Sequence, residues 1–205
     1  MAPRIVRPEQ NIKNKLTEAK QAPVNANVIV KKYKELARRA SISRGTTESI
    51  NWFRSRIRKD ASNRSFEAVT KGFRPIDRPR IGSMVTYMYD PKWKKTLPYY
   101  DTQPLIILVE RNRDGWYGVN MHYLPPKIRA ELLLDIGWVQ KRPLAQLAKG
   151  LERSDYLKHA CKKYLTKQAS SMVVIPKEEW EIVIQLPFEA FEKTTNEKIW
   201  RKARK

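Results

Sequence analysis

Residues 52–80 carry a dense run of basic side chains with four aromatic residues interleaved. Arginine forks bind phosphate oxygens, so this composition favours contact with a polyanion. The aromatic residues Trp52, Phe53, Phe66 and Phe73 are more typical of a core. We interpret the arginines as a surface for a polyanion or for an acidic protein ring. The candidate nucleic-acid-binding residues of this segment are Arg54, Arg56, Arg58, Lys59, Arg64, Arg74, Arg78 and Arg80.

Two further arginines flank a tight turn later in the chain. Arg111 and Arg113 stand just before Asp114-Gly115, a dipeptide that is typical of a short β-hairpin. The tip of the predicted hairpin is therefore basic. Both arginines join the candidates for contact with nucleic acid or with an acidic neighbour.

No group of residues has the spacing of an active site. His122 and His159 have no cysteine or carboxylate at metal-ligand spacing, and the glycines do not cluster into a phosphate-binding loop. We expect His122 to lie on a strand as a hydrogen-bonded, half-buried side chain, and Cys161 to pack in a core. The sequence thus predicts a non-enzymatic protein with no catalytic residue, no cofactor and no metal.

Among enzymes, a metal-dependent nuclease best suits so basic a chain with carboxylates near its strands. Asp101 and, on an apolar strand, Glu110 have the outline of a two-carboxylate site. Such sites usually place a lysine two positions after the glutamate, where this chain has Asn112. Carboxylates beside a basic strand end are more often salt-bridged, so we do not assign a nuclease.

Charge restricts the partners. The 205 residues include 42 Lys and Arg against 21 Asp and Glu, a net charge of +21. So large an excess needs a polyanion, an anionic membrane or an acidic protein to neutralise it. No apolar run approaches a membrane span and the N-terminus lacks the apolar block of a signal peptide, so we expect no membrane partner. The single cysteine excludes an intrachain disulfide.

Apolar spacing predicts helices in the N-terminal half and strands from residue 82. A stripe at helical spacing starts at Ile29, and a second helix starts near Thr46. Alternation over residues 83–90, an apolar run at 104–111 and the returning segment 116–124 predict a three-stranded sheet. Pro125-Pro126 then opens a helix, and Ser154 caps what looks like the clearest helix of the chain, to about Lys167. Residues 171–187 read as strands.

These elements predict an α+β fold, a small antiparallel β-barrel (SH3-like or a rolled sheet) with a helical insertion and basic N-terminal helices. The predicted divisions are an extended arm at 1–27, a basic helical region and linker at 28–80, a barrel-like core at 81–190 with its insertion at about 126–168, and a basic tail at 191–205.

The middle of the chain resembles a family of virion proteins from contractile-tailed bacteriophages, often labelled DNA end protector proteins. The resemblance rests on "MYDPKWKKTLPYYDTQPLIILVE" and "GWYGVNMHYLPPKIRAELL", with "NWFRSRIRK" before them and "IPKEEWEIVIQLPFEAFEKTTNEKIW" after. The family is expected to have a more apolar segment where this chain has "LVERNRDGW". The resemblance implies a virion protein that shields the end of the packaged DNA, and it supplies no catalytic residue.

Two functions follow as expectations. The first is a non-enzymatic virion structural protein at the junction of head, neck and tail that binds and protects the packaged DNA end through its basic residues. The alternative is a neck, tail or baseplate adaptor that docks on acidic protein rings without contacting DNA. The expected partners are double-stranded DNA and portal, neck or tail subunits, with several copies in a symmetric ring. The expected location is the virion, after synthesis in the cytoplasm of the bacterial host.

Overall fold

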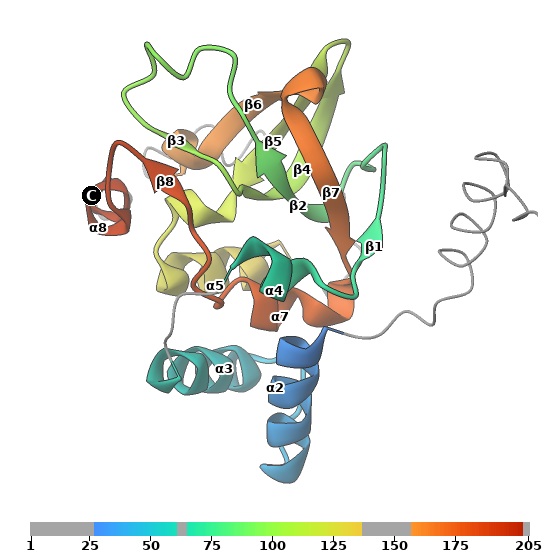
Figure 1. Ribbon diagram of the computed structural model, residues 1–205. Coiled ribbons are helices and arrows are strands. Elements are labelled where there is room, and N and C mark those ends of the chain that lie inside the picture. Colours follow the sequence, from blue (N-terminus) through green and yellow to red (C-terminus); the bar gives the residue numbers. More distant parts are fainter. Residues whose placement is uncertain (1–26, 61–64, 137–156, 203–205) are drawn as a thin grey trace, which may run out of the picture.

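The computed structural model describes residues 27–60, 65–136 and 157–202. Its centre is an antiparallel six-stranded sheet with the order β1-β7-β2-β4-β5-β6 (Figure 1). A second, two-stranded sheet pairs β3 (Tyr100–Asp101) with β8 (Phe191–Glu192). The strands of the large sheet are β1 (Arg74–Pro75), β2 (Met84–Tyr89), β4 (Leu105–Asn112), β5 (Gly115–Asn120), β6 (Cys161–Leu165) and β7 (Ala169–Ile175).

The helices gather mainly on one side of the large sheet. In Figure 1, α5 and α7 lie below the sheet, α2 and α3 lie below them, and α8 lies at one side. Short 3-10 turns lie at 121–123, 158–160, 166–168 and 177–179. The α-helices are α2 (Val28–Arg39), α3 (Thr47–Lys59), α4 (Phe66–Thr70), α5 (Pro126–Asp135), α7 (Trp180–Val183) and α8 (Asn196–Arg201). No helix in these described ranges is long and apolar enough to cross a membrane.

The predicted hairpin at Asp114-Gly115 is confirmed. Strands β4 and β5 pair with Asn112 opposite Gly115. A Cβ atom on Gly115 would lie 1.8 Å from the carbonyl oxygen of Tyr164, so β6 packs against a position that only glycine can fill. A Cβ atom on Gly118 would lie 2.7 Å from the Ile107 carbonyl oxygen, so the glycine allows a close backbone approach between β5 and β4.

Strand alternation divides the apolar residues between two cores. Met84 of β2 joins the large core, which lies between the sheet and the helices. Its neighbours Val85 and Tyr87 face the opposite side, where they pack with Trp116 and Tyr164. The rings of Tyr87 and Trp116 meet edge to face at 5.5 Å, and the Trp116 indole donates a hydrogen bond to the Tyr87 hydroxyl at 3.1 Å. The predicted faces of β2 are therefore confirmed.

The α+β class is confirmed, and the closed barrel is not supported. Strands β1 and β6 are the two edges of the sheet and do not pair with each other. The sheet is nevertheless curled, because only the three residues Thr166–Gln168 connect β6, at one edge, to β7, which lies next to the other edge. The predicted helical insertion is confirmed for α5.

The prediction of a helix from Ser154 to Lys167 is wrong where the structure describes it. Residues Cys161–Leu165 form β6, which pairs along β5 with Tyr164 opposite Trp116. The apolar spacing suited a helix, yet pairing with the exposed edge of β5 determines the conformation. Similarly, Trp180–Val183 was predicted as a strand and forms α7. Residues 1–26 of the predicted arm and Ser154 itself lie outside the described residues.

Candidate nucleic-acid interface

Helix α3 carries the densest group of candidate residues, and its position is fixed at its N-terminus. Thr46 and Ser49 form a reciprocal capping box. The fully buried carboxylate of Glu181, on α7, accepts hydrogen bonds from the Ser49 hydroxyl at 2.8 Å and from the Gly45 amide at 3.1 Å. The same carboxylate forms an ion pair with Arg44. These contacts hold the start of α3 against α7.

The apolar face of α3 is buried, and its basic residues lie on the other faces of the helix. Ile50, Phe53 and Ile57 are buried, so side chains on the other faces lie at the surface. Arg54 and Arg58, four residues apart, lie on one face of the helix. Lys59 follows in the last turn, where the negative end of the helix dipole stabilises positive charge.

A groove of about 990 Å³ runs along this face, and we call it the α3 groove. Its walls come from α3, from the segment that opens α5, from the residues after α7 and from α8. No acidic side chain is among its described lining residues. The groove is lined by Asn51, Arg54, Ser55, Ile57, Arg58, Lys59, Pro125, Pro126, Lys127, Gln185, Pro187 and Trp200.

The basic residues of the α3 groove differ from those that hold the fold together. Arg44 and Arg129 are paired with the buried carboxylates of Glu181 and Glu189. By contrast, Arg54, Arg58 and Lys59 form no ion pair with any carboxylate in the described part of the chain. Among the basic residues that line the groove, Lys127 alone is ion-paired within the described ranges, with Glu131 at 3.7 Å on the surface. Carboxylates of the described residues therefore leave most of the positive charge of the groove uncompensated.

Gln185 gives the α3 groove a second unsatisfied feature. Its side chain is only 6% exposed, and neither its amide nitrogen nor its amide oxygen has a hydrogen-bond partner among the described residues. A buried polar group without a partner costs about 1–3 kcal/mol. Trp200 also lines the groove, and a 2.9 Å hydrogen bond from its indole to the His122 carbonyl holds it in place.

The other candidates lie at separate places. Arg74, Arg78 and Arg80 line a shallow cavity of about 590 Å³ next to β1, together with Asp77. Arg111 and Arg113 are exposed around the tip of the β4–β5 hairpin, on the opposite side of the molecule from α8 (Figure 1). Arg56 is exposed on α3 but does not line the groove, and Arg64 lies outside the described residues.

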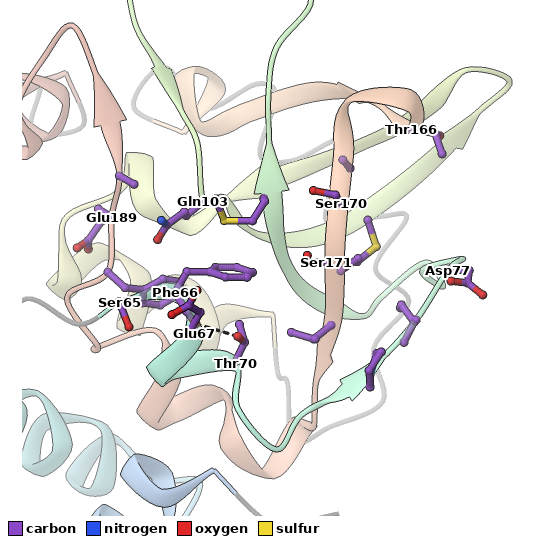
Figure 2. Close-up of a pocket in the computed structure, with 18 of the residues that line it drawn as sticks. Ser65, Phe66, Glu67, Thr70, Asp77, Gln103, Thr166, Ser170, Ser171 and Glu189 are labelled. Carbon is purple, nitrogen blue, oxygen red and sulfur yellow. Dashed lines mark hydrogen bonds between the residues drawn. The ribbon is translucent and has the colours of Figure 1, made fainter. Parts of the chain in front are cut away.

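A third cavity, of about 890 Å³, is unsuited to a polyanion. Figure 2 shows its lining side chains between α4, β7 and residues 187–190. Glu67, Asp77 and Glu189 contribute carboxylates, while Phe66 and Met172 contribute apolar surface. No lysine or arginine is among the described residues that line it. Phosphate groups would be repelled here, so we exclude it from the interface.

The residues considered for a nuclease do not form a metal site. Asp101 is buried and accepts hydrogen bonds from Gln103 and Asn120, and its Oδ2 lies 2.9 Å from the Nδ1 atom of His122. Glu110 is exposed on β4, opposite Tyr117. Within the described ranges, no three acidic, histidine or cysteine residues gather as metal ligands.

His122 is hydrogen-bonded as predicted, but two details of its prediction are wrong. It lies in the 3-10 turn Met121–Tyr123, and it is fully buried. β5 ends at Asn120, whose side-chain oxygen accepts the His122 amide and so starts the turn. Cys161 is partly buried and packs against the large core, as predicted. It lies at the start of β6, however, and not in the predicted helix.

The model of one protein family matches residues 1–203, and its description is Phage T4 terminal DNA protecting protein. The chain belongs to this family. It is therefore a bacteriophage protein of a family named for protecting DNA ends, and the resemblance inferred from the sequence is confirmed. No curated protein and no solved structure matches the chain.

For this member of the family, sequence reasoning found the arginines of α3 but missed the rest of the groove. Lys127, Gln185 and Trp200 come from three segments far from α3 in the sequence. Only Trp200 carried a signal, as an aromatic residue in a basic tail. An unpartnered amide such as that of Gln185 is visible only when the surroundings of the side chain are known.

Proposed function

We propose that this protein binds the end of packaged duplex DNA through the α3 groove and shields it from exonucleases. The observation that carries the proposal is the uncompensated charge of Arg54, Arg58 and Lys59 around a groove with no acidic lining residue. Guanidinium and ammonium groups placed in this way neutralise backbone phosphates without reading the base sequence. The family's name supports DNA ends as the target.

Protection in this proposal needs no chemistry from the protein. An exonuclease must thread or bind the terminal nucleotides, and a protein seated on the terminal phosphates blocks that access. The protein is then non-enzymatic and acts by occupancy. Its place is the virion, at the head–neck junction where the packaged DNA ends, after synthesis in the host cytoplasm.

The two other basic surfaces favour a protein partner in the same particle. The tip of the β4–β5 hairpin, which carries Arg111 and Arg113, and strand β1 both lie away from α8 (Figure 1). One rigid molecule does not bring all of these residues onto a single short DNA end. We propose that they dock on acidic surfaces of portal, neck or tail subunits, with several copies in a ring.

The test measures binding of the purified protein to linear duplex DNA at a series of salt concentrations, together with the rate of exonuclease digestion. Counterion release predicts that log K falls linearly with log salt, with a slope of about −0.9 per phosphate neutralised. Digestion should slow in proportion to the fraction of DNA bound. Absence of binding at low salt, or affinity that salt does not change, would contradict the proposal.

A further inference from the structure

Trp93 is the most exposed aromatic side chain among the described residues. It is 62% exposed, in a loop that joins β2 to β3, and most other large aromatic side chains there pack against one of the two cores. An exposed indole offers a flat apolar face, with a polar N–H at its edge, to a bound molecule.

The loop holds Trp93 in a fixed position. The amide groups of Thr96 and Leu97 both donate to the Trp93 carbonyl at 3.0 Å, which makes a tight turn. The ammonium group of Lys193, just after β8, donates to the carbonyl oxygens of Lys94 at 2.6 Å and Leu97 at 3.0 Å. A side chain from a distant segment therefore fastens the loop from outside.

Positive charge surrounds the exposed ring. The Lys92 ammonium lies 4.9 Å from the centroid of the Trp93 ring, and Lys95 is exposed nearby in the sequence. Neither lysine forms an ion pair within the described ranges, whereas Lys94 pairs with Asp90 at 2.8 Å. An indole with an ammonium group close to its ring, and with no ion-paired carboxylate on that ammonium among the described residues, suits a nucleotide, whose base stacks while its phosphate is neutralised.

Helix α8 and its cap residue contact both this loop and the α3 groove. Trp200 of α8 lines the groove, and Lys202, at the end of the same helix, donates a 2.8 Å hydrogen bond to the Tyr99 hydroxyl in the loop. Figure 1 shows the loop between β2 and β3 above α8, with α3 below. Burial and then the charge of Lys202 lower the pKa of Lys162, so cations are crowded along this side.

We propose that the indole of Trp93 stacks on the terminal base pair of duplex DNA and thereby distinguishes an end from the interior. Inside a duplex both faces of every base pair are covered by neighbours. Only the last pair presents a free face, so a flat ring that stacks on it recognises what charge alone cannot. The inference rests on the proposed DNA binding by the α3 groove.

The test compares the affinity of the protein for an open-ended duplex with its affinity for the same duplex closed by hairpin loops at both ends. Trp93→Leu should lower affinity for the open duplex about tenfold and leave the closed duplex unchanged. Trp93→Phe keeps a ring and should retain most of the preference. Val28→Ala is the control, since it removes another apolar side chain, 74% exposed, on α2.

A second readout reports the contact directly. 2-Aminopurine at the terminal pair should lose fluorescence on binding the native protein, and should lose less on binding Trp93→Leu, because an indole would no longer stack on it. If the native protein binds neither duplex, the proposed function and this inference both fail. If it binds both duplexes equally, or if Trp93→Leu keeps the preference for open ends, only the stacking role of Trp93 is overturned.

Discussion

The ammonium group of Lys202 donates a hydrogen bond of 2.8 Å to the hydroxyl of Tyr99, and the same ammonium lies 4.5 Å from the centroid of that ring. This contact joins the C-terminal helix to the loop that presents Trp93. Because Trp200 of that helix also lines the α3 groove, α8 links a phosphate-binding surface to an exposed aromatic ring. Helix α8 therefore supports both the proposed phosphate-binding groove and the loop whose Trp93 ring is proposed to recognise the DNA end.

The first prediction separates the α3 groove from basic charge in general. The double variant Arg54→Ala/Arg58→Ala should reduce the slope of log K against log salt by about two, because two phosphate contacts are lost. Affinity should fall alike for all DNA sequences. Arg58 is exposed and Arg54 is half-buried on α3, and neither forms an ion pair in the described part of the chain, so thermal unfolding should change little.

A matched control for this variant is Arg111→Ala/Arg113→Ala, which removes the same charge from the hairpin tip. It should leave the salt slope nearly unchanged, since the tip lies away from α8 and the groove (Figure 1). Equal losses in the two double variants would mean that DNA binding depends on net charge and not on the groove.

The sequence predicted local elements well where local chemistry decides them. Alternation gave the two faces of β2, and Asp114-Gly115 gave the β4–β5 turn. Helices α2 and α3 followed from apolar stripes and caps. The segment Cys161–Leu165 failed because Tyr164 and its apolar neighbours fit a helical stripe equally well, and pairing with β5 decides the outcome.

The candidate site was predictable only in part. The sequence shows a run of arginines in α3. It does not show which arginines of the chain are ion-paired to carboxylates in the folded protein. Arg129 reads as one more basic residue, yet it is fully buried, bonds to the carbonyl oxygens of Leu124 and Ile184, and pairs with Glu189. Sorting structural from free arginines requires knowing which carboxylates the fold brings near them.

The second prediction concerns the clamp on the Trp93 loop. Lys193 has a φ of 64°, a conformation that asparagine adopts readily, so Lys193→Asn removes the ammonium group with little backbone strain. The loop carbonyls lose their donor. Hydrogen exchange should quicken at the amides of Lys94, Thr96 and Leu97, and the preference for open DNA ends should weaken. Unchanged exchange rates would show that the loop does not depend on Lys193.

The third prediction tests the buried polar network behind the sheet. The Asn120 amide donates to Asp101 and to the Tyr164 hydroxyl, both at 2.9 Å, and the three side chains are buried. Asn120→Ala leaves the Asp101 carboxylate and the Tyr164 hydroxyl short of a partner, so the free energy of unfolding should fall by about 2–4 kcal/mol. Urea unfolding measures this loss.

A control for the network is Asn112→Ala, at the half-exposed end of β4, which should change stability by about 0.5 kcal/mol or less. A loss of similar size in both variants would mean that strand propensity, and not the buried hydrogen bonds, accounts for the effect.

The last prediction uses the ion pair of Glu189 with the buried Arg129. Burial pushes the pKa of Glu189 upward, but the charge of Arg129 and hydrogen bonds outweigh it, so the pKa is lowered overall. A carboxyl whose pKa is lower in the folded state stabilises the fold above its unfolded pKa, about 4.3, and loses that stabilisation as the pH falls. Glu189→Gln should cost about 3 kcal/mol at pH 7, because the Arg129 charge stays buried without its partner. Between pH 5 and pH 3 the stability of the variant should then fall less than that of the native protein.

Glu192→Gln, at an exposed position, is the control, and thermal unfolding is measured across this pH range for the native protein and both variants. Parallel pH profiles for the native protein and Glu189→Gln would contradict the role of this pair.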